Sequence, residues 1–222
     1  MMKDDRATID PNAQMPPQPS PLQVLSSRQV FRERGGADFT VTAVDVTVRS
    51  TGQPMTIHVA SVKDGRPGAV CLAVLEGNRQ EFYLLARHWR VAIGTWQWEF
   101  PRGMGEPGES PVQTAIRELA EETGLTADPS QVCELHRIHA DPGVMRDDVR
   151  VMELTFPSPP GSDEGATGTI PMQAGSGGTD WELSNLQWVT SRRIREMIQC
   201  GQIIDGLTIS SFAIREFERG TE

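Results

Sequence analysis

Hydrophobic and polar positions alternate along two stretches in the first third of the chain, which is the pattern of half-buried β-strands. Apolar and threonine positions alternate from Phe39 onward, and the segment ends at Val48 in the run VDVTV. Residues 53–63 give a second strand after a turn at residues 50–52. Shorter apolar runs predict further strands at residues 69–75, 81–86, 149–156 and 186–189, the first two joined as a hairpin around Glu76, Gly77 and Asn78.

A different period, with apolar residues three and four positions apart, predicts an α-helix over residues 111–123. The apolar stripe consists of Val112, Ala115, Ile116 and Leu119. Ser110 is a favourable N-cap, Pro111 suits the first helical position, and Gln113 completes a capping box. Gly124 can take the left-handed conformation that ends a helix.

Two more helices are predicted near the end of the chain. One covers residues 191–199, and the other ends at about Phe217. Asp205 and Gly206 form the turn between them, and Thr208 is the predicted cap of the last helix.

The helix at 111–123 carries an acidic stripe beside its apolar one. Glu118, Glu121 and Glu122 are three and four positions apart, and Glu109 lies in the loop that enters the helix. Most acidic runs on helices are solvated faces. Carboxylates packed this closely repel one another unless a cation lies between them, and Mg²⁺ prefers oxygen ligands. The pattern therefore indicates a metal site.

The spacing around these glutamates is specific. Residues 103–125 match Gly-x5-Glu-x7-Arg-Glu-(apolar)-x-Glu-Glu-x-Gly-(apolar), and a chance match at one start position is on the order of one in 10⁹ from average residue usage. The residues in register are Gly103, Glu109, Arg117, Glu118, Leu119, Glu121, Glu122, Gly124 and Leu125. The segment resembles the Nudix box, which excludes a merely solvated acidic face.

The resemblance implies a fold and a chemistry. The fold is an α/β/α sandwich with a mixed central sheet and the box helix on one face, together with a small N-terminal antiparallel sheet. The chemistry is hydrolysis of a nucleoside diphosphate linked to another moiety, with Mg²⁺ or Mn²⁺ as the cofactor. Pyrophosphate is highly anionic, so attack by water requires cations that neutralise its oxygens.

The resemblance also assigns roles within the box. Glu118 and Glu122 are expected to bind metal directly, with the backbone carbonyl of Arg102 as an additional ligand. Glu121 is expected to be a ligand or to act through metal-bound water. Arg117 and Glu109 are expected to pair and hold the loop against the helix, and Gly103 and Gly124 complete the structural positions of the box.

The segment LLARHWRVAIGTWQWEFPRGMGEPGES, residues 84–110, resembles the ADP-ribose pyrophosphatase branch of the family. Arg87 and Arg90 end a strand, and both are candidate substrate contacts because guanidinium groups suit phosphates. Arg90 is favoured as the diphosphate contact over an arginine that merely lies along apolar surface. Glu99 is expected to accept from a substrate hydroxyl or amine, or to join the metal cluster. Arg102 departs from the branch, which has a small residue there.

Downstream, residues 139–156 read HADPGVMRDDVRVMELTF. Members of the branch have an acidic loop at this distance, and it supplies a general base or binds metal. Asp147 and Asp148 are the candidates, in a loop of residues 144–148 expected to be mobile, although aspartate replaces the usual glutamate. A surface turn with both acids in solvent is the alternative. His136 and His139 are too few and too loosely placed for a zinc site.

Composition limits the partners. A net charge of −9 and a pI of about 5.0 argue against nucleic-acid and anionic-membrane binding. No apolar run approaches about 18 residues, and the start of the chain lacks the apolar core of a signal peptide. Cys71, Cys133 and Cys200 have no close spacing, which favours reduced thiols and a cytoplasmic location.

Three regions are expected. Residues 1–25 are polar and proline-rich and are predicted to be a disordered arm. Residues 26–65 form an N-terminal β extension that, by analogy with the branch, makes a homodimer. Residues 66–222 form the Nudix domain, with a flexible loop or lid at 157–179 that is rich in proline, glycine, serine and threonine.

Three functions are compatible with these residues. The leading hypothesis is a Mg²⁺-dependent pyrophosphatase that splits ADP-ribose or a close sugar nucleotide into AMP and a sugar phosphate. The second is the same chemistry on ADP-glucose, GDP-mannose, a flavin dinucleotide or a dinucleoside polyphosphate. The third is a non-catalytic ADP-ribose sensor, against which the retention of every box carboxylate weighs.

Overall fold

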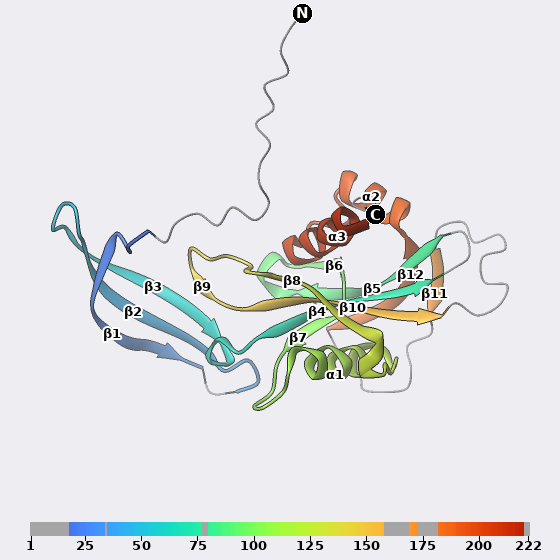
Figure 1. Cartoon of the computed structure of the whole chain (residues 1–222), viewed down its shortest axis with the longest axis horizontal. Helices are drawn as coiled ribbons and strands as arrows, with labels where there is room; N and C mark the ends of the chain where they lie inside the picture. The colour runs from blue at the N-terminus through green and yellow to red at the C-terminus, as the bar shows by residue number, and fades with distance from the viewer. Residues whose placement is uncertain (1–17, 34, 77–79, 158–168, 173–181, 220–222) are drawn as a thin grey trace, which may run out of the picture.

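The computed structural model describes residues 18–33, 35–76, 80–157, 169–172 and 182–219, which form two sheets and three α-helices (Figure 1). The strands are β1 (Leu22–Arg32), β2 (Phe39–Val48), β3 (Pro54–Val62), β4 (Gly68–Glu76), β5 (Glu81–Arg90), β6 (Thr95–Glu99), β7 (Arg102–Met104), β8 (Val132–Ile138), β9 (Met145–Arg146), β10 (Val149–Pro157), β11 (Thr169–Met172) and β12 (Leu183–Thr190). The helices are α1 (Pro111–Thr123), α2 (Ser191–Gln199) and α3 (Gly206–Arg219), with short 3-10 turns at Lys63–Gly65, Val91–Ile93 and Pro129–Gln131.

The larger sheet is mixed. Its strands lie in the order β11-β12-β5-β4-β10-β8, while β6 pairs with β5 and β7 pairs with β4. Strands β4 and β10 are parallel, and the other pairs described in this sheet are antiparallel. Helix α1 covers one face, and α2 and α3 cover the other (Figure 1). The predicted α/β/α sandwich is confirmed.

The central strands are buried on both faces. Along β5, Phe82 and Leu84 pack with the α1 residue Leu119, while Tyr83 and Leu85 pack on the opposite side with the α2 and α3 residues. This alternation follows from the twofold period of a strand. The apolar runs that predicted these strands therefore reflect a sheet with helices on both sides.

The box helix has the predicted bounds. The Ser110 hydroxyl accepts from the Gln113 N–H at 3.3 Å, and the Gln113 side chain accepts from the Ser110 N–H at 2.8 Å. At the other end Gly124 has φ 76°, where a side chain would be strained. Because both ends are fixed by local chemistry, the sequence located this helix correctly.

The smaller sheet has the order β1-β2-β3-β9 and lies at one end of the molecule (Figure 1). Two of its strands were not predicted. Strand β1 begins at Leu22, inside the segment predicted as a disordered arm, whose residues 1–17 lie outside the described part. Nearly every residue of β1 is exposed, so no apolar alternation marks it, and pairing with β2 makes it a strand.

Two other expectations differ from the structure. Asp205, and not Thr208, caps α3, because its carboxylate accepts from the Thr208 N–H at 2.8 Å.

The predicted loop 157–179 contains a strand, because residues 169–172 form β11 against β12. Residues 158–168 and 173–179 of this loop lie outside the described residues. Gly77 and Asn78 of the predicted hairpin turn also lie outside them. None of the helices in the described ranges has the length and apolar content that a membrane span requires.

The capping box gives a direct test of the box helix. Ser110→Ala removes the acceptor for the Gln113 N–H, so we expect the free energy of unfolding to fall by about 1 kcal/mol. Ser110→Asp retains an acceptor at the N-cap and is expected to stay near the wild type. Urea denaturation measures both variants, and equal stabilities would contradict the assignment.

Candidate active site

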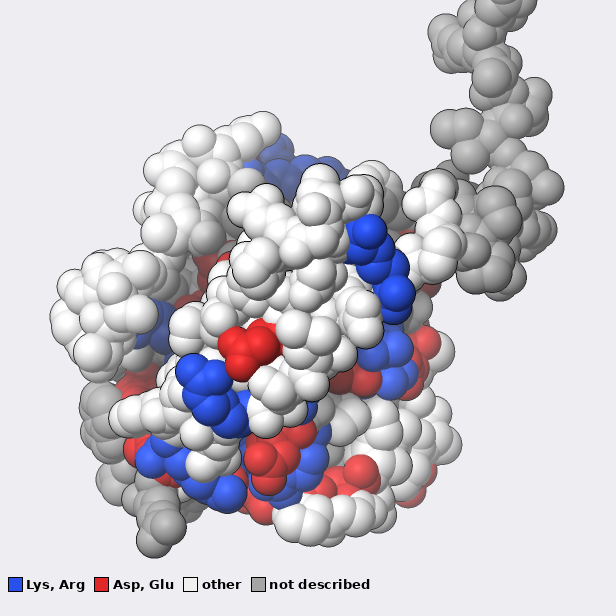
Figure 2. Space-filling model, turned by 90° about the vertical axis from the view of Figure 1, so that its left-hand side faces the viewer, with Lys and Arg blue, Asp and Glu red and all other residues white. Residues whose placement is uncertain are grey.

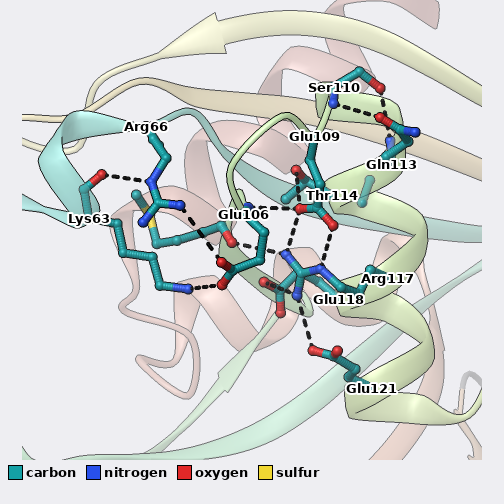
Figure 3. A network of polar contacts seen from close by, with 12 residues as sticks. Lys63, Arg66, Glu106, Glu109, Ser110, Gln113, Thr114, Arg117, Glu118 and Glu121 are labelled. Atoms are coloured by element: carbon teal, nitrogen blue, oxygen red, sulfur yellow. Dashed lines mark hydrogen bonds and ion pairs between the residues drawn. The ribbon is translucent and has the colours of Figure 1, made fainter. Parts of the chain in front are cut away.

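Arg117 on α1 ties the box loop to the box helix (Figure 3). Its Nε and Nη2 donate to the two carboxylate oxygens of Glu109 at 2.8 and 2.9 Å, and Nη2 also donates to the Met104 carbonyl at 3.0 Å. The hydrogen bonds from Arg117 lower the pKa of Glu109 to about 2. This is the pair that the resemblance implied, and it holds the loop that enters the helix beside strand β7.

The same guanidinium reaches two other box carboxylates. Its Nη1 donates to Glu118 Oε1 at 2.8 Å and to Glu121 Oε2 at 3.1 Å. Glu118 is largely buried, whereas the Glu121 side chain is 61% exposed. The structure therefore places Glu121 at the rim, where it can reach solvent.

Glu122 lies on the inner side of α1. One of its oxygens accepts from the backbone N–H of Arg102 at 3.2 Å and lies 3.8 Å from His88 Nε2 on β5. Burial, followed by the charge of Glu118, raises the pKa of Glu122 to about 8. Burial also raises the pKa of Glu118, although Arg117 opposes this shift. These two carboxylates are buried and close enough to repel each other.

Gly103 permits this arrangement. A Cβ at position 103 would overlap the carboxylate of Glu118. Only a glycine leaves room for that side chain against the backbone of β7. The requirement explains why the box needs a glycine here, fifteen positions before Glu118 in the sequence.

The donor chemistry of Glu118 and Glu122 fits a hard divalent cation, which would offset the repulsion of two buried carboxylates. That Glu121 joins them as a third ligand stays a prediction. Among the described residues, no three histidine, cysteine, aspartate or glutamate side chains are grouped as ligands of one ion. The reason is that Arg117 holds Glu121 outward, while Glu122 turns toward β7.

Arg90 and Glu99 form a second centre beside this pair. Arg90 donates from Nε to Glu99 Oε1 at 2.9 Å, and Arg102 Nη2 donates to Glu99 Oε2 at 2.7 Å. Burial opposes ionisation of Glu99, whose side chain is 1% exposed, yet the hydrogen bond from Arg90 and the charges of Arg102 and Arg90 lower its pKa overall. Glu99 is thus an ionised carboxylate that holds two guanidinium groups.

Arg87 does not join this centre. Residues 86, 88 and 90 of β5 share the face of α1, so Arg87 points to the other face. There its guanidinium carbon lies 5.9 Å from the centre of the Trp96 ring. The structure therefore separates the two arginines that the sequence grouped as substrate contacts.

The described contacts of Asp147 and Asp148 are with residues other than the box glutamates. The Asp147 carboxylate accepts from the Ala140 N–H at 2.9 Å, and Asp148 pairs with Arg137 and Arg150 at 2.9 and 3.0 Å. The loop expected to be mobile contains β9, which pairs with β3 as the fourth strand of the small sheet. Both carboxylates therefore hold the loop in place through these contacts and do not point freely into solvent.

Two residues that contribute to the site, His88 and Lys63, were not predicted from the sequence. His88 lies against Glu122, and the twofold period of β5 could have placed it on the α1 face. Lys63 comes from the turn after β3 and pairs with Glu106 in the box loop (Figure 3). Lys63 and Asp64 both have positive φ, 44° and 58°, and no sequence pattern predicted this conformation. This turn joins the small sheet to the box.

A cavity of about 360 Å³ adjoins these groups. Its polar wall contains Arg90 and Arg102, next to Gly103 of the box. The remaining wall is mostly apolar. A cavity with few polar groups beside a pair of buried carboxylates is the expected form of a small-molecule site.

Comparison with known proteins agrees with this geometry. The model of the NUDIX domain matches residues 65–203. The chain is 34% identical over 135 residues to the mouse ADP-sugar pyrophosphatase, which covers 60% of the chain and 61% of that protein. It is 35% identical over 85 residues to CMP-5'-(N-acetyl-N-hydroxy-3-aminopropyl)phosphonate hydrolase of Streptomyces rubellomurinus, which covers 38% of each.

The fold also matches a solved structure. A crystal structure of an ADP compounds hydrolase superposes with a TM-score of 0.67 at 18% identity, covering 93% of this chain and 98% of that one. The chain thus spans under two thirds of the length of the curated relatives but nearly all of this fold. The domain match covers more than half of the chain and includes the box, its helix and the sheet that holds them, and we conclude that the chain belongs to the Nudix family.

Proposed function

We propose that this chain is a metal-dependent pyrophosphatase that hydrolyses ADP-ribose, or a related nucleoside diphosphate sugar, to AMP and a sugar phosphate. The observation that carries the proposal is the buried pair Glu118 and Glu122 on the box helix, beside a cavity with Arg90 in its wall. The mouse relative is an ADP-sugar pyrophosphatase and the solved structure is an ADP compounds hydrolase, which supports an ADP-linked substrate.

Nudix hydrolases generally use divalent metal ions, and we propose Mg²⁺ here, with Mn²⁺ as a substitute. Glu118, Glu122 and the backbone carbonyl of Arg102 would hold the metal. When bound, it would neutralise pyrophosphate oxygens and make water a better nucleophile. Its donors are all oxygen, which suits these two ions.

The side chains around the metal position the substrate. Arg90 is held by Glu99, so its planar guanidinium is fixed in orientation before substrate arrives. Glu99 is fully engaged with arginines, and we propose that it orients them instead of contacting the substrate itself.

Glu121 is the proposed acceptor of the proton from the attacking water. It is exposed at the rim and shares one hydrogen bond with Arg117. Asp147 and Asp148 are weaker candidates, because their contacts to the loop would have to open first.

The two arginines of β5 provide a matched pair for testing the site. Arg90→Ala should lower kcat/KM for ADP-ribose by roughly 10- to 100-fold, since it removes charged hydrogen bonds to the diphosphate. Arg87→Ala changes the opposite face, and its kcat/KM should stay within about threefold of the wild type.

Glu121→Gln should lower kcat by about 100-fold through loss of the proton acceptor.

The assay is phosphate release after added phosphatase, for a panel of ADP-ribose, ADP-glucose, GDP-mannose, flavin adenine dinucleotide and a dinucleoside polyphosphate, with Mg²⁺ or Mn²⁺. The phosphatase acts only on the phosphate esters that cleavage of the pyrophosphate exposes. ADP-ribose among the poorest substrates would contradict the substrate assignment. Absence of turnover with every member would favour a binding protein over an enzyme.

The raised pKa of Glu122 predicts how stability depends on pH without metal. Its folded pKa of about 8 exceeds the ordinary 4.5, so the folded state binds this proton more tightly and unfolding becomes easier as pH rises through that window. Glu122→Gln carries no such charge. At about pH 9 it should be more stable than the wild type, and at about pH 4 the difference should shrink.

Thermal unfolding in a chelating buffer measures this effect, and added Mg²⁺ should stabilise the wild type more than Glu122→Gln. A wild type that is as stable at about pH 9 as the variant would argue against a buried ionisable group at this position.

We also propose that the chain is a homodimer joined through its N-terminal β extension. Strand β1 is the edge of the small sheet and exposes Val24, Leu25, Val30 and Phe31. Seen from that end, uncharged residues dominate the upper surface (Figure 2). An exposed apolar edge strand favours pairing with another chain.

Three free cysteines are compatible with the reducing cytoplasm.

Leu25→Lys combined with Phe31→Lys should convert the dimer into a monomer, because charged side chains would be buried at the interface. Sedimentation velocity measures the mass. Phe217→Lys replaces an even more exposed apolar residue, which lies on α3, and should leave the dimer intact. A monomeric wild type would contradict the proposal.

A further inference from the structure

Two cavities lie next to each other beyond strand β7. The first, of about 360 Å³, contains Arg90 and Gly103 of the candidate site in its wall. The second, of about 240 Å³, lies between residues 138–140 and the start of α3. Arg102 and Leu207 line both cavities, so these two residues form the wall between them.

Two carboxylates fix the side chain of Arg102 in that wall. Its Nη2 donates to Glu99 Oε2 at 2.7 Å and to Asp205 Oδ1 at 3.2 Å. Asp205 is itself fixed, since its other oxygen accepts from the Thr208 N–H and hydroxyl at 2.8 and 2.7 Å. The wall is therefore anchored to β6 on one side and to α3 on the other.

Moving this guanidinium away would be costly. Glu99 is 1% exposed and would lose one of its two arginine partners without gaining water. Leaving a buried carboxylate short of a partner is strongly unfavourable. The wall is thus a rigid part of the site, unlike an exposed arginine that could swing aside.

The backbone of Arg102 places this wall relative to the reacting groups. Its N–H donates to Glu122, one of the proposed metal ligands, while its side chain extends to the first turn of α3. Arg102 thus spans from Glu122 to the first turn of α3, where Asp205 and Gly206 line the second cavity.

We propose that Arg102 is a specificity-determining residue that closes the first cavity from the second. It limits the moiety on the far side of the diphosphate to a compact sugar and disfavours a second nucleoside. The inference rests on the proposed pyrophosphatase function and adds to it a reason for substrate choice.

The test compares kcat/KM for ADP-ribose with that for diadenosine diphosphate, in which a second adenosine replaces the terminal ribose. Arg102→Ala joins the two cavities and should raise the ratio of the bulky to the compact substrate by about tenfold or more. Arg102→Lys retains a long cation in the wall and should change the ratio much less. An unchanged ratio in Arg102→Ala would overturn the proposal.

Two further variants protect the test against indirect effects. Leu207→Ala opens the same wall without touching the ion pairs and should shift the ratio in the same direction. Ser210 lines only the second cavity and is exposed. Ser210→Trp alone should leave kcat/KM for both substrates unchanged. In the Arg102→Ala background it should refill the opened space and restore the wild-type ratio of the two kcat/KM values.

The outcomes separate the two proposals. Turnover of both substrates with a ratio that no wall variant alters overturns the role of Arg102 alone. Failure of Ser210→Trp to reverse the shift in Arg102→Ala also overturns it, because the gained space would then not be the second cavity. Absence of turnover of any panel substrate by the wild type overturns the pyrophosphatase and, with it, this inference.

Discussion

The close approach of the Glu118 and Glu122 side chains to the backbone of β7 is the constraint on which the site depends. Gly103 makes the approach possible, because any side chain there would occupy the space of the Glu118 carboxylate. The packing of α1 against the sheet through Ala115 and Leu119 then fixes the depth at which the carboxylates lie. Helix and strand together bury two acids that would otherwise face solvent.

Arginines balance this buried negative charge, and each does so at a different place. Arg117 engages the outer carboxylates and the box loop, whereas Arg90 and Arg102 share Glu99 on the sheet side. Of Glu109, Glu118, Glu121 and Glu122, only Glu122 has no hydrogen bond from an arginine side chain in the described contacts; it accepts from the backbone N–H of Arg102 instead. Burial and the charge of Glu118 raise the pKa of Glu122, whereas the hydrogen bonds from Arg117 lower that of Glu109.

The small sheet is joined to the site by more than chain connectivity. The turn after β3 brings Lys63 to Glu106 of the box loop, and β9 inserts the segment before Asp147 into the same sheet. Two residues with positive φ at this turn are held by these surrounding contacts. The arrangement gives the N-terminal extension a direct structural link to the groups proposed for catalysis.

The sequence by itself determined the box helix and its acidic stripe, because capping, apolar period and glutamate spacing are all local properties. It also determined the central strands, whose burial on both faces leaves a continuous apolar run. Strands β1 and β8 were not predicted because most of their residues are exposed, and β6, β7, β9 and β11 were not predicted because two to five residues carry too little pattern.

Only the tertiary structure decided which of the candidate residues meet. Arg87 and Arg90 are three positions apart in the sequence, but the pleat of β5 sends them to opposite faces. Asp205 joins Arg102 across about a hundred residues, and the loop of Asp147 and Asp148 is closed by pairing of β9 with β3. Such contacts depend on strand register and on the approach of distant segments, which no local pattern specifies.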